Sequence, residues 1–200
     1  MDRLEWKALW KEEEARAHIH GWDFSHIQGR FEEEHDLPWS YRRLVRQYLR
    51  NDTALLDYDT GGGEFLLSLG HPADRTAATE GYPPNVKLCR EALLPLGIDF
   101  RDCSNPSEIP FSGGSFDLIL NRHGSFDPEE LFRLLKPGGV FLTEQVGEDN
   151  ERDLVERVLP GIPKPFPHKN LQEQQAAFQA AGFRILRGEE AFRPILFYDV

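Results

Sequence analysis

The sequence is poor in cysteine and has no long apolar runs. Its 200 residues include two cysteines, Cys89 and Cys103, which lie in separate segments and form no CxxC pair. This pattern excludes a disulfide framework and a cysteine-ligated zinc site, so we expect reduced thiols and no metal. Apolar stretches such as 118–120 and 140–142 fall far short of the roughly 20 residues that a membrane span needs. We therefore expect no membrane partner.

Positive charge is also scarce. Lys and Arg number 23 against 34 Asp and Glu, which gives a formal net charge of −11. An acidic surface repels phosphate backbones, and this argues against a nucleic-acid partner. Residues 1–16 lack the basic-then-apolar order of a secretory signal and are too acidic for a mitochondrial transit peptide. We expect a cytoplasmic protein.

The sequence divides into two segments that differ in composition and in the spacing of apolar residues. Residues 1–50 hold all four tryptophans and show helical spacing of apolar residues, which predicts a helical appendage. In residues 51–200, short apolar runs alternate with helical patterns, as is typical of a parallel α/β sheet. A chain of this length supports one core with a modest appendage. The predicted strands are 54–57, 75–80, 98–102, 116–120 and 140–146, and the predicted helices are 63–69, 85–96, 128–135 and 171–181.

A glycine turn follows the first predicted strand, in LLDYDTGGGEFLL at 55–67. A strand, a glycine turn and a helix place backbone N–H groups at the carboxyl end of the strand, where ligands bind. The turn lacks the Gly-Lys-Ser/Thr of a triphosphate-binding loop. Asp57 and Asp59 flank the place of a pyrophosphate, and a dinucleotide fingerprint needs a glycine where Leu66 stands. A cationic nucleoside without phosphate fits better, which indicates S-adenosylmethionine (SAM) as cofactor.

Acidic and aromatic residues end the next two predicted strands. Glu80 lies 19 residues beyond Gly61, where a carboxylate can accept hydrogen bonds from ribose hydroxyls. Asp102 is placed to accept from the adenine amino group, and Tyr82 is near enough to stack on the ring. Each residue alone also fits a cap, a solvated acid or a packing aromatic. Together, in this order, they favour a nucleoside site.

Four motifs recur in order: LLDYDTGGGE, ATEGYPPN, FRDCSNPSEIPFSGGSFDLILNRH and ELFRLLKPGGVFLTEQVG. The sequence, over about residues 55–147, resembles the class I SAM-dependent methyltransferases, in particular the small-molecule group similar to the ubiquinone/menaquinone C-methyltransferases. The resemblance implies a Rossmann-like sheet of seven strands, in the order 3-2-1-4-5-7-6, with helices on both faces. It implies a SAM site at the ends of the first strands. The residues that match this site are Asp57, Gly61, Gly63, Glu80, Asp102 and Asn121.

Two features depart from the family pattern. The family turn reads acid-x-Gly-x-Gly-x-Gly, and Asp59 stands where the first glycine is expected. Its carboxylate would either attract the ammonium group of SAM or repel the carboxylate of SAM. The family sheet also ends in an antiparallel strand edge, whereas only 194–200 remains after the segment 183–188. We therefore expect a core shortened at the C-terminus.

One histidine is placed for catalysis. Methyl transfer is an in-line displacement, for which a protein supplies approach geometry and a base that deprotonates the acceptor. His123, which follows Asn121 and Arg122 beyond the fourth predicted strand, is the best-placed base, and a packing role is the equal alternative. His18 and His20 lack a third ligand of recognisable spacing, so we expect no metal there.

The N-terminal aromatics admit two interpretations. Trp22, Phe24, Trp39 and Tyr41 either line a lid over SAM and its acceptor or dock the appendage on the sheet. The leading hypothesis is a cytoplasmic methyltransferase with a small-molecule substrate. The alternatives are a non-catalytic binding or regulatory protein of the same fold, an RNA or protein methyltransferase that uses a local arginine patch at 42–50, and a nicotinamide-binding Rossmann protein.

Overall fold

The computed structural model describes residues 2–16, 27–33 and 37–198. Its contacts divide the chain into two compact units. One consists of Met1–Trp39 and Ala191–Val200, and the other of Ser40–Glu190. None of the described helices has the length and apolar composition that crossing a bilayer requires.

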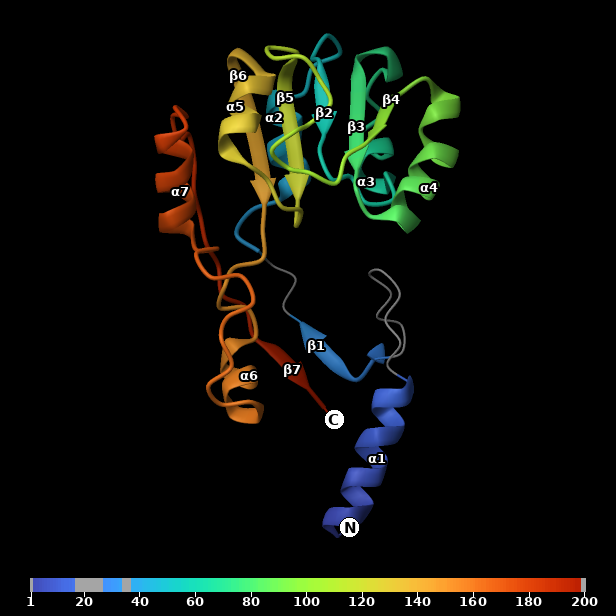
Figure 1. Ribbon diagram of the computed structural model, residues 1–200, viewed down its shortest axis with the longest axis vertical. Coiled ribbons are helices and arrows are strands. Elements are labelled where there is room, and N and C mark those ends of the chain that lie inside the picture. Colours follow the sequence, from blue (N-terminus) through green and yellow to red (C-terminus); the bar gives the residue numbers. More distant parts are fainter. Residues whose placement is uncertain (1, 17–26, 34–36, 199–200) are drawn as a thin grey trace. The chain divides into compact units, whose positions relative to one another are not determined.

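The larger unit is built on a parallel sheet of five strands (Figure 1). Its spatial order is β4-β3-β2-β5-β6, so the order reverses beside β2. The carboxyl ends of β2 and β5 therefore form the switch point at which α/β sheets bind ligands. The strands are β2 (Leu55–Asp57), β3 (Thr76–Glu80), β4 (Asp99–Asp102), β5 (Phe116–Arg122) and β6 (Leu135–Glu144).

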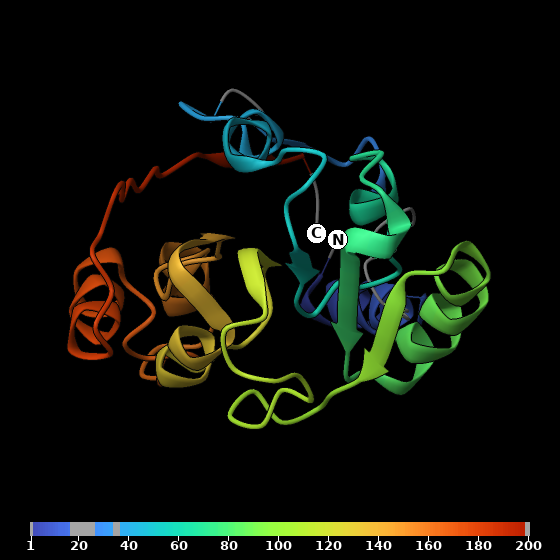
Figure 2. The same cartoon turned by 90° about the horizontal axis from the view of Figure 1, so that it is seen from above.

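Helices cover both faces of this sheet (Figure 2). Side chains alternate along a strand, so Leu55 and Leu118 join one apolar cluster while Leu56 and Ile119 join the other. Burial on both faces explains the continuous apolar runs of the central strands, 55–56 in β2 and 118–120 in β5. The helices α2 (Tyr41–Tyr48), α3 (Glu64–Leu67) and α4 (Pro83–Ala92) contribute to the first cluster, and α5 (Pro128–Leu134) and α7 (Leu171–Ala180) to the second. The short helices η2 (Ala73–Arg75) and η3 (Leu94–Leu96) and the helix α6 (Arg152–Val158) complete the unit.

Side-chain caps fix where several helices begin. The side chain of Ser40 accepts a hydrogen bond from a first-turn amide of α2, Asp127 does so for α5 and Asn170 for α7. Such caps satisfy backbone donors that have no partner inside the helix. Proline occupies the first turn of α4 and of α5, where its missing N–H costs nothing.

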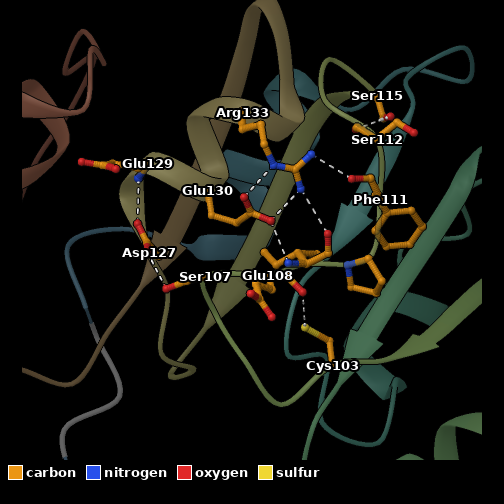
Figure 3. A network of polar contacts seen from close by, with 12 residues as sticks. Cys103, Ser107, Glu108, Phe111, Ser112, Ser115, Asp127, Glu129, Glu130 and Arg133 are labelled. Carbon is orange, nitrogen blue, oxygen red and sulfur yellow. Dashed lines mark hydrogen bonds and ion pairs between the residues drawn. The ribbon is translucent and has the colours of Figure 1, made fainter.

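An arginine on α5 holds the loop between β4 and β5 (Figure 3). The Arg133 guanidinium donates to both carboxylate oxygens of Glu130 at 2.6 Å and to the carbonyls of Phe111 and Ile109 at 2.9 and 3.1 Å. Glu130 in turn accepts from the Ile109 amide at 2.7 Å. These bonds tie the loop after β4 to helix α5, and both contribute to the second apolar cluster.

The smaller unit contains a helix and a two-stranded antiparallel ribbon. The helix is α1 (Arg3–Arg16), and the ribbon pairs β1 (Phe31–Glu33) with β7 (Ile195–Phe197). The rings of Phe31 and Phe197 face each other across the ribbon at 6.2 Å. An ion pair of 2.6 Å joins Arg30 to Glu13 on α1.

The structure confirms the parallel α/β class and all five predicted strands, with shifted ends. The expectation of a seven-stranded sheet is wrong for the described residues, which form five strands in that sheet. The segment 183–188 forms no strand; Phe183 and Ile185 pack against the second apolar cluster. The segment at Ile195–Phe197 does form a strand, but it pairs with β1.

The division into units also differs from the boundary predicted at residue 50. Helix α2 lies in the sheet unit, because Tyr41 and Val45 are buried in the same cluster as Leu55. Tyr41 is therefore a core residue of the sheet unit. Trp22, Phe24 and the histidines at 18 and 20 lie outside the described residues. The lid role of residues 1–50 stays a prediction.

Candidate functional site

Asp57 is the last residue of β2 and is buried, with 5% of its surface exposed. The hydroxyl of Thr60 donates a hydrogen bond of 2.6 Å to its carboxylate. Burial raises the pKa of Asp57 to about 6, and the Thr60 bond and the charge of Arg122 oppose this shift. The site thus begins with an acid that can exchange a proton near neutral pH.

The glycine turn that follows has three residues in the left-handed backbone region. They are Asp59 at φ 59°, Gly61 at φ 67° and Gly63 at φ 85°. Glycine adopts this conformation without strain, and aspartate tolerates it better than most residues do. Asp59 therefore keeps a glycine-like backbone where the family pattern has glycine, and adds a carboxylate to it. Gly63 begins α3, and a Cβ there would lie 3.0 Å from the Leu93 side chain.

Glu80 joins the turn to the end of β3. Its side chain is buried, with the residue 2% exposed. One carboxylate oxygen accepts from the Gly61 amide at 2.7 Å, and the other accepts from the amides of Gly81 and Tyr82 at 2.9 and 2.8 Å. An ionised carboxylate offers about four acceptor positions; three backbone amides take three of them, and Glu80 also shares a hydrogen bond with the Asp59 carboxyl group. The ends of β2 and β3 are fixed against each other by this one side chain.

The carboxyl group of Asp59 lies between Glu80 and the loop after β5. A Cβ added to Gly124 in that loop would be 2.2 Å from an Asp59 carboxylate oxygen, which is why only glycine fits there. Desolvation raises the pKa of Asp59 to about 7, and the charge of Glu80, its hydrogen bond and the charge of Asp57 add to the shift. Three acids in one cluster, two of them buried and Asp59 partly buried, favour a shared proton or a cationic ligand.

Asn121, near the end of β5, links the glycine turn to the segment after β6 by hydrogen bonds. It is fully buried; its Nδ2 donates to the Tyr58 carbonyl at 2.9 Å, and its Oδ1 accepts from Gln145 Nε2 at 2.7 Å. The buried Tyr41 hydroxyl donates to the carbonyls of Leu142 and Asn121 at 3.0 and 3.3 Å. Burial raises the pKa of Tyr41, so this hydroxyl keeps its proton. These bonds hold β5, β6 and the glycine turn together beneath the ligand edge.

Asp102 lies directly across from Glu80 in the pairing of β3 with β4. Its carboxylate accepts from two nitrogens of Arg90 on α4, at 2.5 and 3.3 Å. The ring of Tyr82 is 54% exposed. A cavity of about 440 Å³ opens at these strand ends. It is lined by Gly81, Pro83, Val86, Lys87, Arg90, Asp102, Cys103 and Ser104.

His123 follows β5 in a left-handed conformation, φ 63°, and its amide donates to the Glu144 carbonyl at 3.0 Å. Partial desolvation and then the neighbouring Arg122 lower the pKa of its imidazole. The ring is therefore neutral at pH 7, as a base must be. No group of three or more His, Cys, Asp or Glu side chains among the described residues is arranged to hold a metal ion.

The comparisons with known proteins concern the fold. The sequence matches no protein-family model and no curated protein. A SAM-dependent methyltransferase from Aquifex aeolicus is similar, with a TM-score of 0.56 at 21% identity over 82% of this chain and 86% of that one. Another from Mesorhizobium loti has a TM-score of 0.56 at 17% identity over 74% and 83%. The fold is that of the class I methyltransferases.

This methyltransferase fold also occurs in the [4+2]-cyclase SpnF, which has a TM-score of 0.54 at 21% identity over 73% of this chain and 58% of that one. At these identities the likeness establishes the fold, and the chemistry has to be argued from the site.

Within this fold, the predicted residues fall into three groups. Asp57, Asp59, Gly61 and Glu80 form one cluster at the ends of β2 and β3, in which Asp57 and Glu80 are buried. Tyr82 and Asp102 lie beside it at the ends of β3 and β4. Asn121 and His123 lie at the end of β5, with Asn121 bonded to the Tyr58 carbonyl behind the turn. Their roles toward a ligand stay predictions.

Sequence reasoning missed the partners of these residues. Thr60, three residues after Asp57, has the spacing of a local side-chain turn and could have been found. Arg90 and Gln145 carry no local signal, because their bonds to Asp102 and Asn121 depend on how α4 and β6 pack against their neighbours.

Proposed function

We propose that this protein is a SAM-dependent methyltransferase that acts on a small-molecule acceptor in the cytoplasm. The observation that carries the proposal is the Glu80 carboxylate, which is held by the amides of Gly61, Gly81 and Tyr82 at the end of β3, next to the switch point of a methyltransferase fold. A ribose hydroxyl would take the place of Asp59 as the fourth partner of this carboxylate.

The neighbouring residues fit the rest of a nucleoside. Asp102 at the rim of the 440 Å³ cavity offers acceptor oxygens for the adenine amino group, although Arg90 already holds both of them. The exposed ring of Tyr82 suits stacking on the base. The acids at the glycine turn suit a positively charged ligand tail. SAM, when bound, supplies a methyl group on a sulfonium.

His123 is the proposed base. Its neutral imidazole would take the proton that the acceptor loses as the new bond to the methyl group forms. In a screen of small nucleophiles with SAM, His123→Ala is expected to lower kcat by about 10²-fold or more. His168→Ala removes another exposed histidine and serves as the matched control.

Calorimetric titration tests the cofactor assignment. We expect SAM and S-adenosylhomocysteine to bind and NAD to give no heat, because the turn has acids where a pyrophosphate would lie. Binding of NAD in preference to SAM, or no binding of SAM and S-adenosylhomocysteine, would contradict the proposal.

One observation favours a second candidate, a non-catalytic binding or regulatory protein of the same fold. Asp59 brings a carboxylate into the buried acid cluster where the family turn has glycine. S-adenosylhomocysteine binding without methyl transfer to any acceptor in the screen would favour this candidate.

A further inference from the structure

Arg122, the last residue of β5, rests on an aromatic platform. Its guanidinium carbon lies 4.9 Å from the centroid of the Phe65 ring and 5.9 Å from that of Tyr41. The two rings are 5.4 Å apart and come from the first turns of α3 and α2. Such stacking orients a guanidinium while leaving its in-plane donors available.

The platform is rigid. Tyr41 is buried, and its hydroxyl is bonded to carbonyls of β5 and β6. Phe65 follows the glycine turn directly and packs against the first apolar cluster. The arginine is therefore held by elements that belong to the core of the sheet unit.

The hydrogen-bond donors of Arg122 are not used within the described part of the chain. Neither a hydrogen bond nor an ion pair to another described residue holds its guanidinium, which lies at an exposed position. Its positive charge opposes the burial that raises the pKa of Asp57, but the Asp57 carboxylate accepts its hydrogen bond from Thr60 and not from Arg122. A guanidinium carries five N–H donors.

Arg42 provides an internal contrast. Its guanidinium stacks on the same Phe65 ring at 5.4 Å, but it donates to the carbonyl and hydroxyl of Ser68 at 3.1 and 2.8 Å. One arginine on this ring is thus engaged with backbone and side chain, whereas the guanidinium of the other, at the end of β5, bonds to no described residue.

We propose that Arg122 binds a carboxylate of a ligand at the carboxyl ends of β2 and β5. The planar fork of a guanidinium matches a carboxylate with two parallel hydrogen bonds. The carboxylate belongs either to the amino-acid end of the methyl donor or to the acceptor. This inference rests on the proposed function for the identity of the methyl donor. It adds that one of the ligands carries a carboxylate, which Arg122 binds.

The first arm of the test concerns the donor. S-adenosylhomocysteine and its analogue without the carboxylate, 5′-(3-aminopropylthio)-5′-deoxyadenosine, are titrated into wild type, Arg122→Ala, Arg122→Lys and Arg42→Ala. If the donor supplies the carboxylate, Arg122→Ala weakens S-adenosylhomocysteine by about tenfold or more and leaves the analogue unchanged. Arg122→Lys keeps the charge but not the two parallel donors, so its affinity for S-adenosylhomocysteine lies between those of wild type and Arg122→Ala. Arg42→Ala, the matched control, leaves both affinities unchanged.

The second arm concerns the acceptor, with benzoate as a simple planar carboxylate. Benzoate is titrated into the protein, with and without saturating S-adenosylhomocysteine, and followed by NMR. If the acceptor supplies the carboxylate, Arg122→Ala abolishes benzoate binding and leaves the affinity for S-adenosylhomocysteine unchanged. Circular dichroism checks that each variant is folded.

The two arms separate this inference from the proposed function. If wild type binds no S-adenosylhomocysteine, the proposed function fails, while loss of benzoate binding in Arg122→Ala alone still supports the carboxylate site. If Arg122→Ala changes neither the binding of S-adenosylhomocysteine nor that of benzoate, the carboxylate site is overturned.

Discussion

At the scale of single residues, Glu80 connects the most parts of the site. Its two oxygens accept from amides that follow β2 and amides that follow β3. Removal of this side chain therefore affects the glycine turn as well as ligand binding. The sequence predicted an acid at this strand end. It could not predict that backbone amides take most of its acceptor capacity, because that depends on how closely the turn after β2 approaches β3.

The first prediction concerns Glu80→Ala. We expect the affinity for S-adenosylhomocysteine to fall by about 1.5 to 3 kcal/mol, because a charge-assisted acceptor is lost. The melting temperature should fall as well, since the Gly61 amide loses its partner. Glu64→Ala changes an exposed acid at the start of α3 and should leave both values unchanged. Unchanged affinity in Glu80→Ala would remove Glu80 from the nucleoside site.

The second prediction concerns Asp59→Gly, which restores the family turn. We expect tighter binding of SAM, because the substitution removes a side chain and a negative charge at a close backbone approach. The glycine also relieves an aspartate in a left-handed conformation. Weaker binding, measured by calorimetry, would instead mean that Asp59 is a ligand for the ammonium group.

The acids of the turn also predict how stability depends on pH. The folded-state pKa values of Asp57 and Asp59, about 6 and 7, lie above the ordinary value of 3.8, so the folded state binds these protons more tightly than the unfolded chain does. Their contribution therefore makes the free energy of unfolding fall as the pH rises from about 4 to about 7.

The third prediction follows from this sign. Asp59→Asn removes the cost of burying that charge, so it should stabilise the protein by about 1 to 3 kcal/mol at pH 8 and by less at pH 5. Urea unfolding at the two pH values measures the difference. A gain that is equal at both pH values would contradict the elevated pKa of Asp59.

At the scale of elements, local patterns were sufficient to predict the strands, whereas their order in the sheet came from the family resemblance. Apolar runs bounded by Gly, Pro, Asn or Asp predicted β2 to β5 with ends shifted by two residues or fewer. The start of β6 was missed, because β6 begins at Leu135 and runs through Pro137 and two glycines. The partner of the C-terminal strand was also missed, since strand pairing between distant segments leaves no trace in either segment.

The fourth prediction concerns the loop between β4 and β5. Arg133→Met should leave Glu130 without its partner and free the carbonyls of Ile109 and Phe111. We expect faster hydrogen exchange in residues 103–115 and a loss of about 1 to 3 kcal/mol in stability. Lys136→Met breaks the more exposed pair with Asp117 and should cost less than 1 kcal/mol. Unchanged exchange in Arg133→Met would mean that apolar packing alone holds the loop.

At the scale of the whole molecule, the chain combines a sheet unit and a smaller unit built from both ends of the sequence. The composition of residues 1–50 suggested a lid, and its aromatic residues at 22 and 24 lie outside the described residues. Whether this segment acts as a lid is tested by comparing its hydrogen exchange with and without a bound ligand.

The fifth prediction is that residues 1–50 form a lid whose order depends on ligand, and hydrogen exchange over residues 21–41 measures it. A segment with frequent charges and few aliphatic residues buries little by itself, so we expect slower hydrogen exchange there when S-adenosylhomocysteine is bound. Residues 128–134 of α5 serve as the internal reference. Equal protection with and without the ligand would mean a fixed structural layer.

The central claim is that a SAM-type nucleoside binds at the end of β3, and NMR titration of the backbone amides with S-adenosylhomocysteine tests it most directly. We predict the largest shifts at Gly61, Gly81 and Tyr82, whose amides bond to the Glu80 carboxylate. Saturable shifts that leave these three amides unmoved, or no shifts at all, would contradict the account.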